Sequence, residues 1–424
     1  MVRTCDPVIS ASNSPQVARS GVSYAGVDMT AGSNLCLDAF TIALNEASSG
    51  GESYLSTKYL QLASLQLCIA CRGVSTLLVE IDGSTPRRLW TDPAEQSHRT
   101  RVPLLRAHSI VWMPSADAAI MACDTNILAN VQNVYFGRKF DRSLDHVVWP
   151  PKVRKIVFGA HCDKKSAVFN KPITKVVWPS SLQQLTFGTE FNQPIKGVAW
   201  PASLQQLTFG TEFNQPIKGV AWPASLQQLT FGNTFNQPIK EVALPVSLQQ
   251  LTFGTEFRQP IEGMVWPASL QQLTFGYYFN QPIKGVVWPA SLQRLTFGHW
   301  FNKPIKEVAW PAVLQQLTFG PRFNQPIEGV AWPASLNQLT FGLRFNQPIE
   351  GVLWPASLQQ LTFGMAFNQP IEGVAWPASL QQLTFGDGFN RPIEGVDWSA
   401  SPQLETLEYH FSQSIEGVAW PYSG

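Results

Sequence analysis

A 22-residue repeat dominates this chain and restricts the folds that it can adopt. Each unit carries a Phe-Gly pair, and the pairs are 22 residues apart except for one step of 29 residues. The pairs begin at Phe136, Phe158, Phe187, Phe209, Phe231, Phe253, Phe275, Phe297, Phe319, Phe341, Phe363 and Phe385. A unit of this length cannot bury a core alone, so consecutive units must stack. We therefore expect a solenoid of about 13 coils over residues 134–424, with a degenerate last coil at 399–424.

The typical unit, Leu204–Ser225, predicts one short parallel strand and little regular helix. Leu207 and Phe209 alternate with polar residues, which is the period of a half-buried strand, and Gly210 is expected to permit the turn that follows. The run Val220–Trp222 allows a second strand. Two prolines in the unit block helix propagation. Further recurring apolar positions should face inward, namely Phe213, Ile217, Val220 and Trp222.

An asparagine recurs five residues after the Phe of the Phe-Gly pair, as at Asn214. An amide both donates and accepts hydrogen bonds, so a stacked Asn column can satisfy backbone groups at a corner of each coil. Asp141, Arg258 and Ser412 interrupt the column. Because a buried Arg is costly, the Arg258 side chain is expected to reach solvent.

The run Phe-Asn-Gln-Pro-Ile, followed by Gly-Val, a Pro and then Ser-Leu-Gln-Gln-Leu-Thr-Phe-Gly, resembles the FNIP repeat. The resemblance covers Val134 to about Pro421. It implies a mainly β, leucine-rich-repeat-like (LRR-like) parallel solenoid, a role in protein interaction and no catalytic residues. In ordinary leucine-rich repeats the Asn follows the last Leu by three residues. Here it follows Phe by five, so the pattern alone does not predict a horseshoe curvature.

The region before the array differs in composition. Residues 1–52 are rich in Ser, Ala and Gly and are expected to be disordered. Residues 53–133 are interpreted as a divergent N-terminal cap or as degenerate (worn) repeats. Cys68 and Cys71 form the one metal-like motif, but no second pair completes a zinc site, so buried thiols are favoured and no metal or cofactor is predicted. Cysteines without an obvious disulfide framework favour an intracellular, cytoplasmic compartment.

The pair that follows Phe-Gly varies among copies, from Thr-Glu through Tyr-Tyr to Asp-Gly, while most positions hardly change. Residues this different cannot all suit a core, so we expect the pairs to be exposed and to stack into a variable stripe. Trp, Tyr and Arg, which dominate interface hot spots, occupy its middle. The candidate binding residues are Tyr277, Tyr278, His299, Trp300, Arg322 and Arg344. Drift at tolerant surface positions is the competing interpretation.

Charge also changes along the array. Residues 134–310 contain 18 Lys or Arg and 9 Asp or Glu, a net charge of +9, and residues 311–424 contain 3 and 9, a net charge of −6. Such a dipole can steer partners or favour head-to-tail self-association. The alternative interpretation is that the Lys and Glu side chains at equivalent positions are merely solvated surface residues that were copied when the repeats were duplicated.

The sequence favours a non-enzymatic scaffold that binds a protein partner through the variable stripe. The net charge of the whole chain is +1, no apolar run is long enough for a membrane helix, and no nucleophile–base pair or paired carboxylate recurs. Neither an enzyme nor a membrane partner is therefore expected, and nucleic acid is not favoured. Two alternatives stay open: an ice- or carbohydrate-binding face on the Thr column that includes Thr208, and nucleic-acid contact through the basic half, with stacking from Tyr277 and Trp300.

Overall fold

The computed structural model describes residues 76–79, 109–112, 130–159, 167–393 and 395–408. Within them, a single parallel sheet contains one strand from each coil, in the order of the sequence. The strands are β1 Thr76–Val79, β2 Ser109–Trp112, β3 Asn133–Phe136, β4 Lys155–Phe158, β5 Gln184–Thr186, β6 Gln206–Thr208, β7 Gln228–Thr230, β8 Gln250–Thr252, β9 Gln272–Thr274, β10 Arg294–Thr296, β11 Gln316–Thr318, β12 Gln338–Thr340, β13 Gln360–Thr362, β14 Gln382–Thr384 and β15 Thr406–Glu408. The one helical element in the described part is a 3-10 turn, η5 Trp398–Ala400. The predicted LRR-like parallel solenoid with almost no helix is confirmed.

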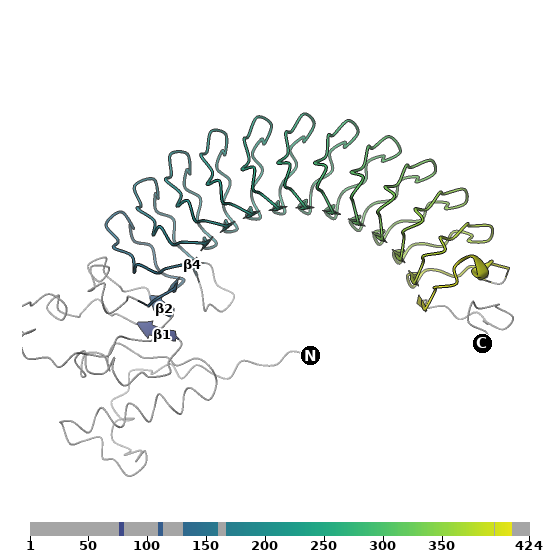
Figure 1. The fold of residues 1–424 in the computed structure, drawn as a ribbon, viewed down its shortest axis with the longest axis horizontal. Helices are drawn as coiled ribbons and strands as arrows, with labels where there is room; N and C mark the ends of the chain where they lie inside the picture. The colour runs from purple at the N-terminus through teal and green to yellow at the C-terminus, as the bar shows by residue number, and fades with distance from the viewer. Residues whose placement is uncertain (1–75, 80–108, 113–129, 160–166, 394, 409–424) are drawn as a thin grey trace, which may run out of the picture.

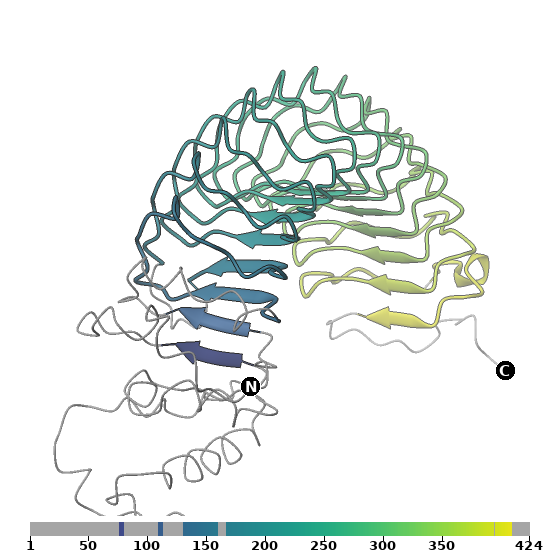
Figure 2. The same ribbon diagram turned by 60° about the vertical axis from the view of Figure 1, so that its left-hand side comes forward.

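Neighbouring strands pair in exact repeat register, so each side chain meets its own equivalent. Leu207 of β6 lies between Leu185 of β5 and Leu229 of β7. Figure 1 shows the coils as an arc, with the strands along its inner side and the long turns outside, and Figure 2 shows the strands side by side in one curved sheet. The second strand considered at Val220–Trp222 does not form, because Val220 N bonds within its own coil to Ile217 O instead of to a neighbouring coil.

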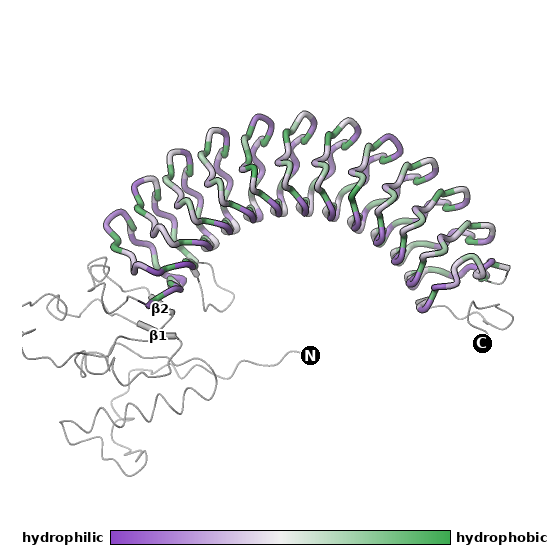
Figure 3. Tube along the Cα trace, viewed as in Figure 1, coloured by the Kyte–Doolittle hydropathy of each residue, from purple (hydrophilic) through white to green (hydrophobic). Residues whose placement is uncertain are grey.

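The core consists of columns of identical side chains. Leu207 and Phe209 are 1% and 3% exposed, which confirms the predicted inward alternation. Phe209 stacks on Phe213 of its own coil at a ring-centroid distance of 3.9 Å, and each ring also stacks on its equivalents in adjacent coils. Hydrophobic and hydrophilic residues therefore alternate in the same order in every coil (Figure 3).

The curvature of the arc follows from the size of these columns. Parallel strands lie about 4.8 Å apart. From Phe187 to Phe385 the rings directly after the strands are 5.6–5.9 Å apart, and from Phe191 to Phe389 the next column has spacings of 6.0–6.2 Å. Each coil is thus a wedge that is thinner at its strand than at its aromatic rings. Stacked wedges bend the solenoid toward the strands, which places the sheet on the concave side.

The Asn column forms the predicted ladder. Asn214 Oδ1 accepts hydrogen bonds from Asn236 N at 2.9 Å and from Gln237 Nε2 at 3.0 Å, so one amide serves the next coil twice. Asp141 continues the ladder, because its carboxylate accepts from Asn170 N at 3.0 Å. The side chain of Arg258 is 53% exposed, as expected for a cation at this corner. Ser412 lies outside the described residues.

The turn predicted after Gly210 forms, since Phe213 N donates to Gly210 O at 3.2 Å, but the glycine itself is required for a different reason. From Gly188 to Gly386 the glycines at this position do not adopt a positive φ, although Gly159 does, with a φ of 82°; instead, a Cβ added at Gly276 would overlap the carbonyl oxygen of Gly254 in the preceding coil. Close approach of the two backbones therefore requires glycine here. The positive φ occurs on the turn opposite the strand, for example at Gly285, where φ is 77° and no atom lies within 4 Å of an added Cβ.

The two glycine positions should respond differently to the same substitution. Gly276→Asn should lower the free energy of unfolding by about 3 kcal/mol or more, because the clash is with rigid backbone. Gly285→Asn should cost less than about 1 kcal/mol, since Asn accepts the left-handed region and the space is open. Denaturant unfolding followed by far-ultraviolet circular dichroism measures both. Equal losses would contradict the close-approach explanation.

The Trp column is a second test of packing. Trp266, Trp288 and Trp376 are buried, whereas Trp222 is only half buried and packs against the core, so the predicted inward Trp position holds in part. Trp288→Ala should cost about 3–5 kcal/mol through the cavity it leaves. Trp288→Leu should cost less, because Leu244 fills the same position in its own coil. If both variants shift the denaturant midpoint equally, the position is not a filled site of the core.

The domain boundaries predicted before residue 134 stay predictions. β1 and β2 pair in the same parallel sheet as β3, but most of residues 53–133 lies outside the described residues, and so do all of residues 1–52, Cys68 and Cys71. Within the described part, no cluster of three or more His, Cys, Asp or Glu side chains could hold a metal ion. No helix found there has both the length and the hydrophobicity needed to cross a membrane.

Candidate interaction surface

The variable stripe lies where the chain leaves each strand and turns away from the concave sheet. Its backbone is fixed by hydrogen bonds between coils, in which the second residue of a pair donates to the first residue of the preceding pair. Tyr278 N bonds to Thr255 O at 3.0 Å, Trp300 N to Tyr277 O at 2.9 Å, and Arg322 N to His299 O at 3.0 Å. The side chains can therefore differ from coil to coil without a change in the path of the backbone.

Four aromatic rings from two adjacent coils meet at the middle of the stripe. Tyr277 stacks on His299 with a centroid distance of 4.4 Å and an interplanar angle of 15°. Tyr278 meets Tyr277 edge to face at 4.9 Å and lies 6.0 Å from Trp300. His299 and Trp300 lie 6.3 Å apart, which closes the group. Tyr277 is 42% exposed and the other three are half buried, so the rings form a continuous surface with one open edge.

Two guanidinium groups cover the ends of this aromatic group. The Cζ atom of Arg322 lies 3.4 Å from the ring centroid of Trp300, and that of Arg258 lies 4.8 Å from the ring centroid of Tyr278. Both distances are within the range of a cation–π interaction. Arg258 also forms an ion pair with Glu256. The resulting row is Arg258, Tyr278, Trp300 and Arg322, one side chain from each of four consecutive coils. We call these four residues, together with Tyr277 and His299, the aromatic–arginine cluster.

The cluster brings together five of the six predicted residues and adds Arg258. Arg344 lies one coil farther on and is exposed. In the sequence, Arg258 is recognisable only as an interruption of the Asn column. Its place one coil before Tyr278 is the signal that could have assigned it to the cluster. The neighbouring side chains of Leu343 and Met365, which are 49% and 51% exposed, extend the stripe with apolar surface beyond the predicted set.

The charges around the cluster are unevenly compensated. Burial lowers the pKa of His299, and the charges of Arg322 and Arg344 lower it further, so the imidazole is neutral at neutral pH. In the part of the chain that the structure describes, neither Arg322 nor Arg344 lies within ion-pair distance of a carboxylate; the pairs formed are Lys171–Asp141, Lys218–Glu241, Arg258–Glu256 and Lys284–Glu307. The basic end of the cluster therefore carries charge that no carboxylate of the described residues balances by an ion pair.

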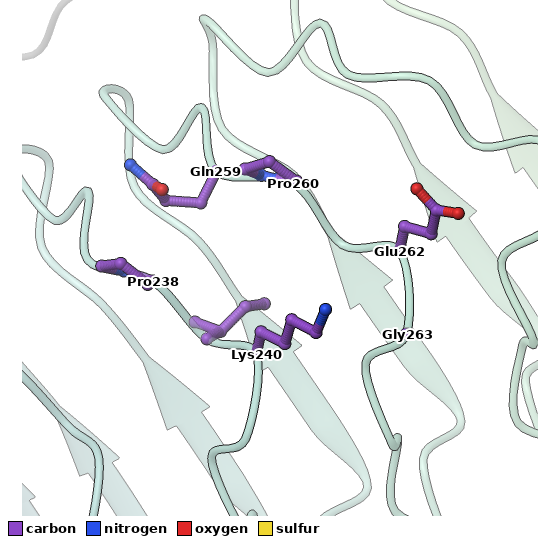
Figure 4. A pocket seen from close by; sticks show the side chains of 7 residues that line it. Pro238, Lys240, Gln259, Pro260, Glu262 and Gly263 are labelled. Carbon is purple, nitrogen blue, oxygen red and sulfur yellow. The ribbon is translucent and has the colours of Figure 1, made fainter.

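The outer turns carry the predicted charge ladders and a shallow groove. Lys218 Nζ lies 2.7 Å from Glu241 Oε2 of the next coil, and this contact raises the pKa of Lys218 and lowers the pKa of Glu241. An inter-coil groove of about 580 Å³ lies nearby (Figure 4). It is lined by Pro238, Ile239, Lys240, Gln259, Pro260, Glu262 and Gly263. Its lining contains no nucleophile–base pair, and the same residue types recur in other coils, so we assign it no separate chemistry.

The Thr column that suggested ice or carbohydrate binding lies on the strands. Thr208 and its equivalents are half buried, and because the sheet lines the concave side, the column follows the curve of the arc (Figure 1). A curved row is a poor match for a flat crystal surface. The ice, carbohydrate and nucleic-acid alternatives stay predictions.

Comparisons with known proteins agree with the repeat and the fold. The FNIP repeat family matches residues 169–211, 191–234, 235–278, 279–321, 301–344, 323–366 and 367–396. The chain is similar to CroV588, described as a novel circular LRR protein, with 36% sequence identity and a TM-score of 0.64 over 82% of this chain and 52% of that one.

The chain therefore spans about half the length of that circular protein. A weaker similarity, to the pneumococcal vaccine antigen PcpA, has 12% identity and a TM-score of 0.20 over 74% of each chain. No curated protein matches. Since the family covers residues 169–396 almost without interruption, in register with the coils, the chain belongs to the FNIP repeat family.

Proposed function

We propose that this FNIP repeat protein is a non-enzymatic scaffold that binds a protein partner through the variable stripe, with Tyr277, Tyr278, His299, Trp300, Arg322 and Arg344 as the binding residues. The observation that carries the proposal is the aromatic–arginine cluster. Other coils have Thr, Asn, Glu, Ala or Gly at these positions, so the rings and guanidinium groups are not needed to build a coil. Tyr, Trp and Arg supply large, rigid contact area at a low entropic cost.

The cluster is also preorganised for binding. Stacking between Tyr277 and His299, and between Trp300 and Arg322, holds these side chains in place before a partner arrives. A partner then loses little binding energy to the ordering of side chains, which is a main cost of association. LRR-like solenoids are typically non-enzymatic and expose long regular surfaces, which suits an extended partner.

Exchange between coils gives a test that leaves the fold intact. Tyr278→Thr and Trp300→Glu install the residues found at the same position in Thr234 and Glu256. Each change, made separately in the full-length protein, should weaken capture of the partner in a pull-down, with a loss of binding energy of about 2 kcal/mol or more for each true hot spot. Thermal unfolding should show that both variants stay folded.

Lys196→Ala and Glu372→Ala are matched controls on the outer turns. They should capture the same partner as the wild-type chain. If these controls abolish capture while the cluster variants retain it, the charged turns are the interface, and the variation in the stripe is neutral sequence drift.

We also propose head-to-tail self-association as a second mode of interaction. The basic residues 134–310 and the acidic residues 311–424 provide opposite charges toward the two ends of one molecule. Similarity to a circular protein, of which this chain matches 52%, supports the idea that coils from two molecules can continue one arc. Contacts of this heterologous kind close into rings when the rotation per subunit allows it.

Light scattering at two salt concentrations tests the self-association. The average mass should exceed that of a monomer at low salt and fall toward it in about 1 M salt, where the Debye length is about 3 Å. Glu350→Lys with Glu372→Lys should weaken the association at low salt. A monomer under all conditions contradicts this second proposal and leaves the first one untouched.

A further inference from the structure

The basic end of the variable stripe has donors that the protein itself does not use. The face of the Arg322 guanidinium lies on Trp300, its buried Nε is closed to a ligand, and its two terminal nitrogens form no hydrogen bond within the described part of the chain. Arg344, in the next coil, is exposed and likewise has no carboxylate within ion-pair distance there. Guanidinium groups form their strongest hydrogen bonds with carboxylates or phosphates. The two neighbouring arginines therefore define an anion site with two positions, one coil apart.

The spacing of the second residues of successive pairs, the column that contains both arginines, is close to that of an extended peptide. In this column Tyr278 and Trp300 lie 6.0 Å apart, and the Phe rings that directly follow each pair are 6.1–6.2 Å apart from Phe257 to Phe345, whereas the first residues Tyr277 and His299 stack at 4.4 Å. In an extended strand, side chains on one face recur every second residue, at about 6.6–6.8 Å. The difference is roughly 0.6 Å per coil, so alternate residues of a peptide stay aligned with successive coils over about four coils.

Acidic residues flank the cluster and favour a short peptide over a nucleic acid. Glu256 and Glu212 lie in the same column before the aromatic rings, and Asp387 lies in the stripe after Met365. A polynucleotide along the stripe would bring phosphates against these carboxylates. A peptide can place its negative charges over the two arginines alone and have apolar side chains on either side of them.

Resting on the function proposed above, we infer that the stripe from Tyr278 to Met365 binds an extended acidic segment of the partner protein. Carboxylates at positions i and i+2 of that segment pair with Arg322 and Arg344. An aromatic side chain at i−2 packs on the half-buried rings of Tyr278 and Trp300, and an apolar side chain at i+4 packs on Met365. The pattern is thus apolar-x-acid-x-acid-x-apolar.

Recognition in this complex is by side chains. The backbone N–H groups of the second pair positions already bond between coils, as from Arg322 to His299 and from Arg344 to Pro321. They are therefore not free to form a ladder with the peptide, as they would in strand addition. Because the recognition pattern reads the same in both directions, a peptide of reversed sequence should bind within a few-fold of the original.

Two synthetic peptides of one composition test the spacing. Fluorescein-labelled Ser-Phe-Thr-Glu-Thr-Glu-Thr-Leu-Ser places both Glu side chains on one face, whereas Ser-Phe-Thr-Thr-Glu-Glu-Thr-Leu-Ser places them on opposite faces. Fluorescence anisotropy with the full chain should give about tenfold tighter binding for the first peptide, since the second leaves one arginine without its charge-assisted pair. Equal affinities for the two peptides, or no binding of either, would overturn the inference.

Variants of the full chain identify the residues responsible. Arg322→Gln with Arg344→Gln should remove the preference for the first peptide. Lys196→Gln with Lys240→Gln changes the net charge equally but lies on the outer turns, and it should keep the preference. Arg322 occupies the position of Glu256 and Trp300 in other coils, so the double variant should fold, and circular dichroism with thermal unfolding checks this.

The outcome separates this inference from the proposed function. If partner capture still depends on Tyr278 and Trp300 but neither peptide binds, the stripe is an interface, but the inference that it binds an acidic segment is wrong. If an oligothymidylate binds through Arg322 and Arg344 and the peptides do not, the ligand is a nucleic acid and the inference also fails.

Discussion

Stacking of phenylalanine rings between coils is the interaction on which the rest of this structure depends. No coil buries a core alone, and the paired columns that include Phe209 and Phe213 connect each coil to both neighbours. Their spacing of 5.6–6.2 Å exceeds the separation of the strands, and this difference bends the solenoid. In the variable stripe, Tyr278 and Trp300 have a similar separation of 6.0 Å, whereas Tyr277 and His299 stack more closely, at 4.4 Å. The packing distance of the Phe columns therefore determines the shape of the arc, and side chains of the stripe can adopt a closer spacing than these columns.

Much of the fold could be predicted from the sequence, because the repeat shows every constraint about ten times. Alternation of Leu207 and Phe209 with polar residues gave the strand and its inward face. The chemistry of a stacked amide gave the Asn ladder. These features depend on residue type and period alone, and the structure confirms them.

Other features depend on distances between coils, which a period cannot supply. The curvature requires the size of stacked rings relative to the strand spacing. The turn after Gly210 was predictable, but the reason for glycine there depends on the position of the preceding backbone, which the period does not show. Arg258 reaches Tyr278 of the next coil from a different position of the repeat, and a comparison of equivalent positions does not detect such a pair. Most of the candidate surface was predictable, but the arrangement that joins its residues was not.

The contact between consecutive glycines after the strands has a mechanical consequence. There the backbones already touch, at the inner edge of a curved stack, because even a Cβ at Gly276 would overlap Gly254. Tighter bending would push these backbones into each other, whereas straightening separates them only gradually. The contact therefore sets a lower limit on the radius of the arc. A ligand lying along several coils would therefore meet a surface whose curvature has a fixed upper limit.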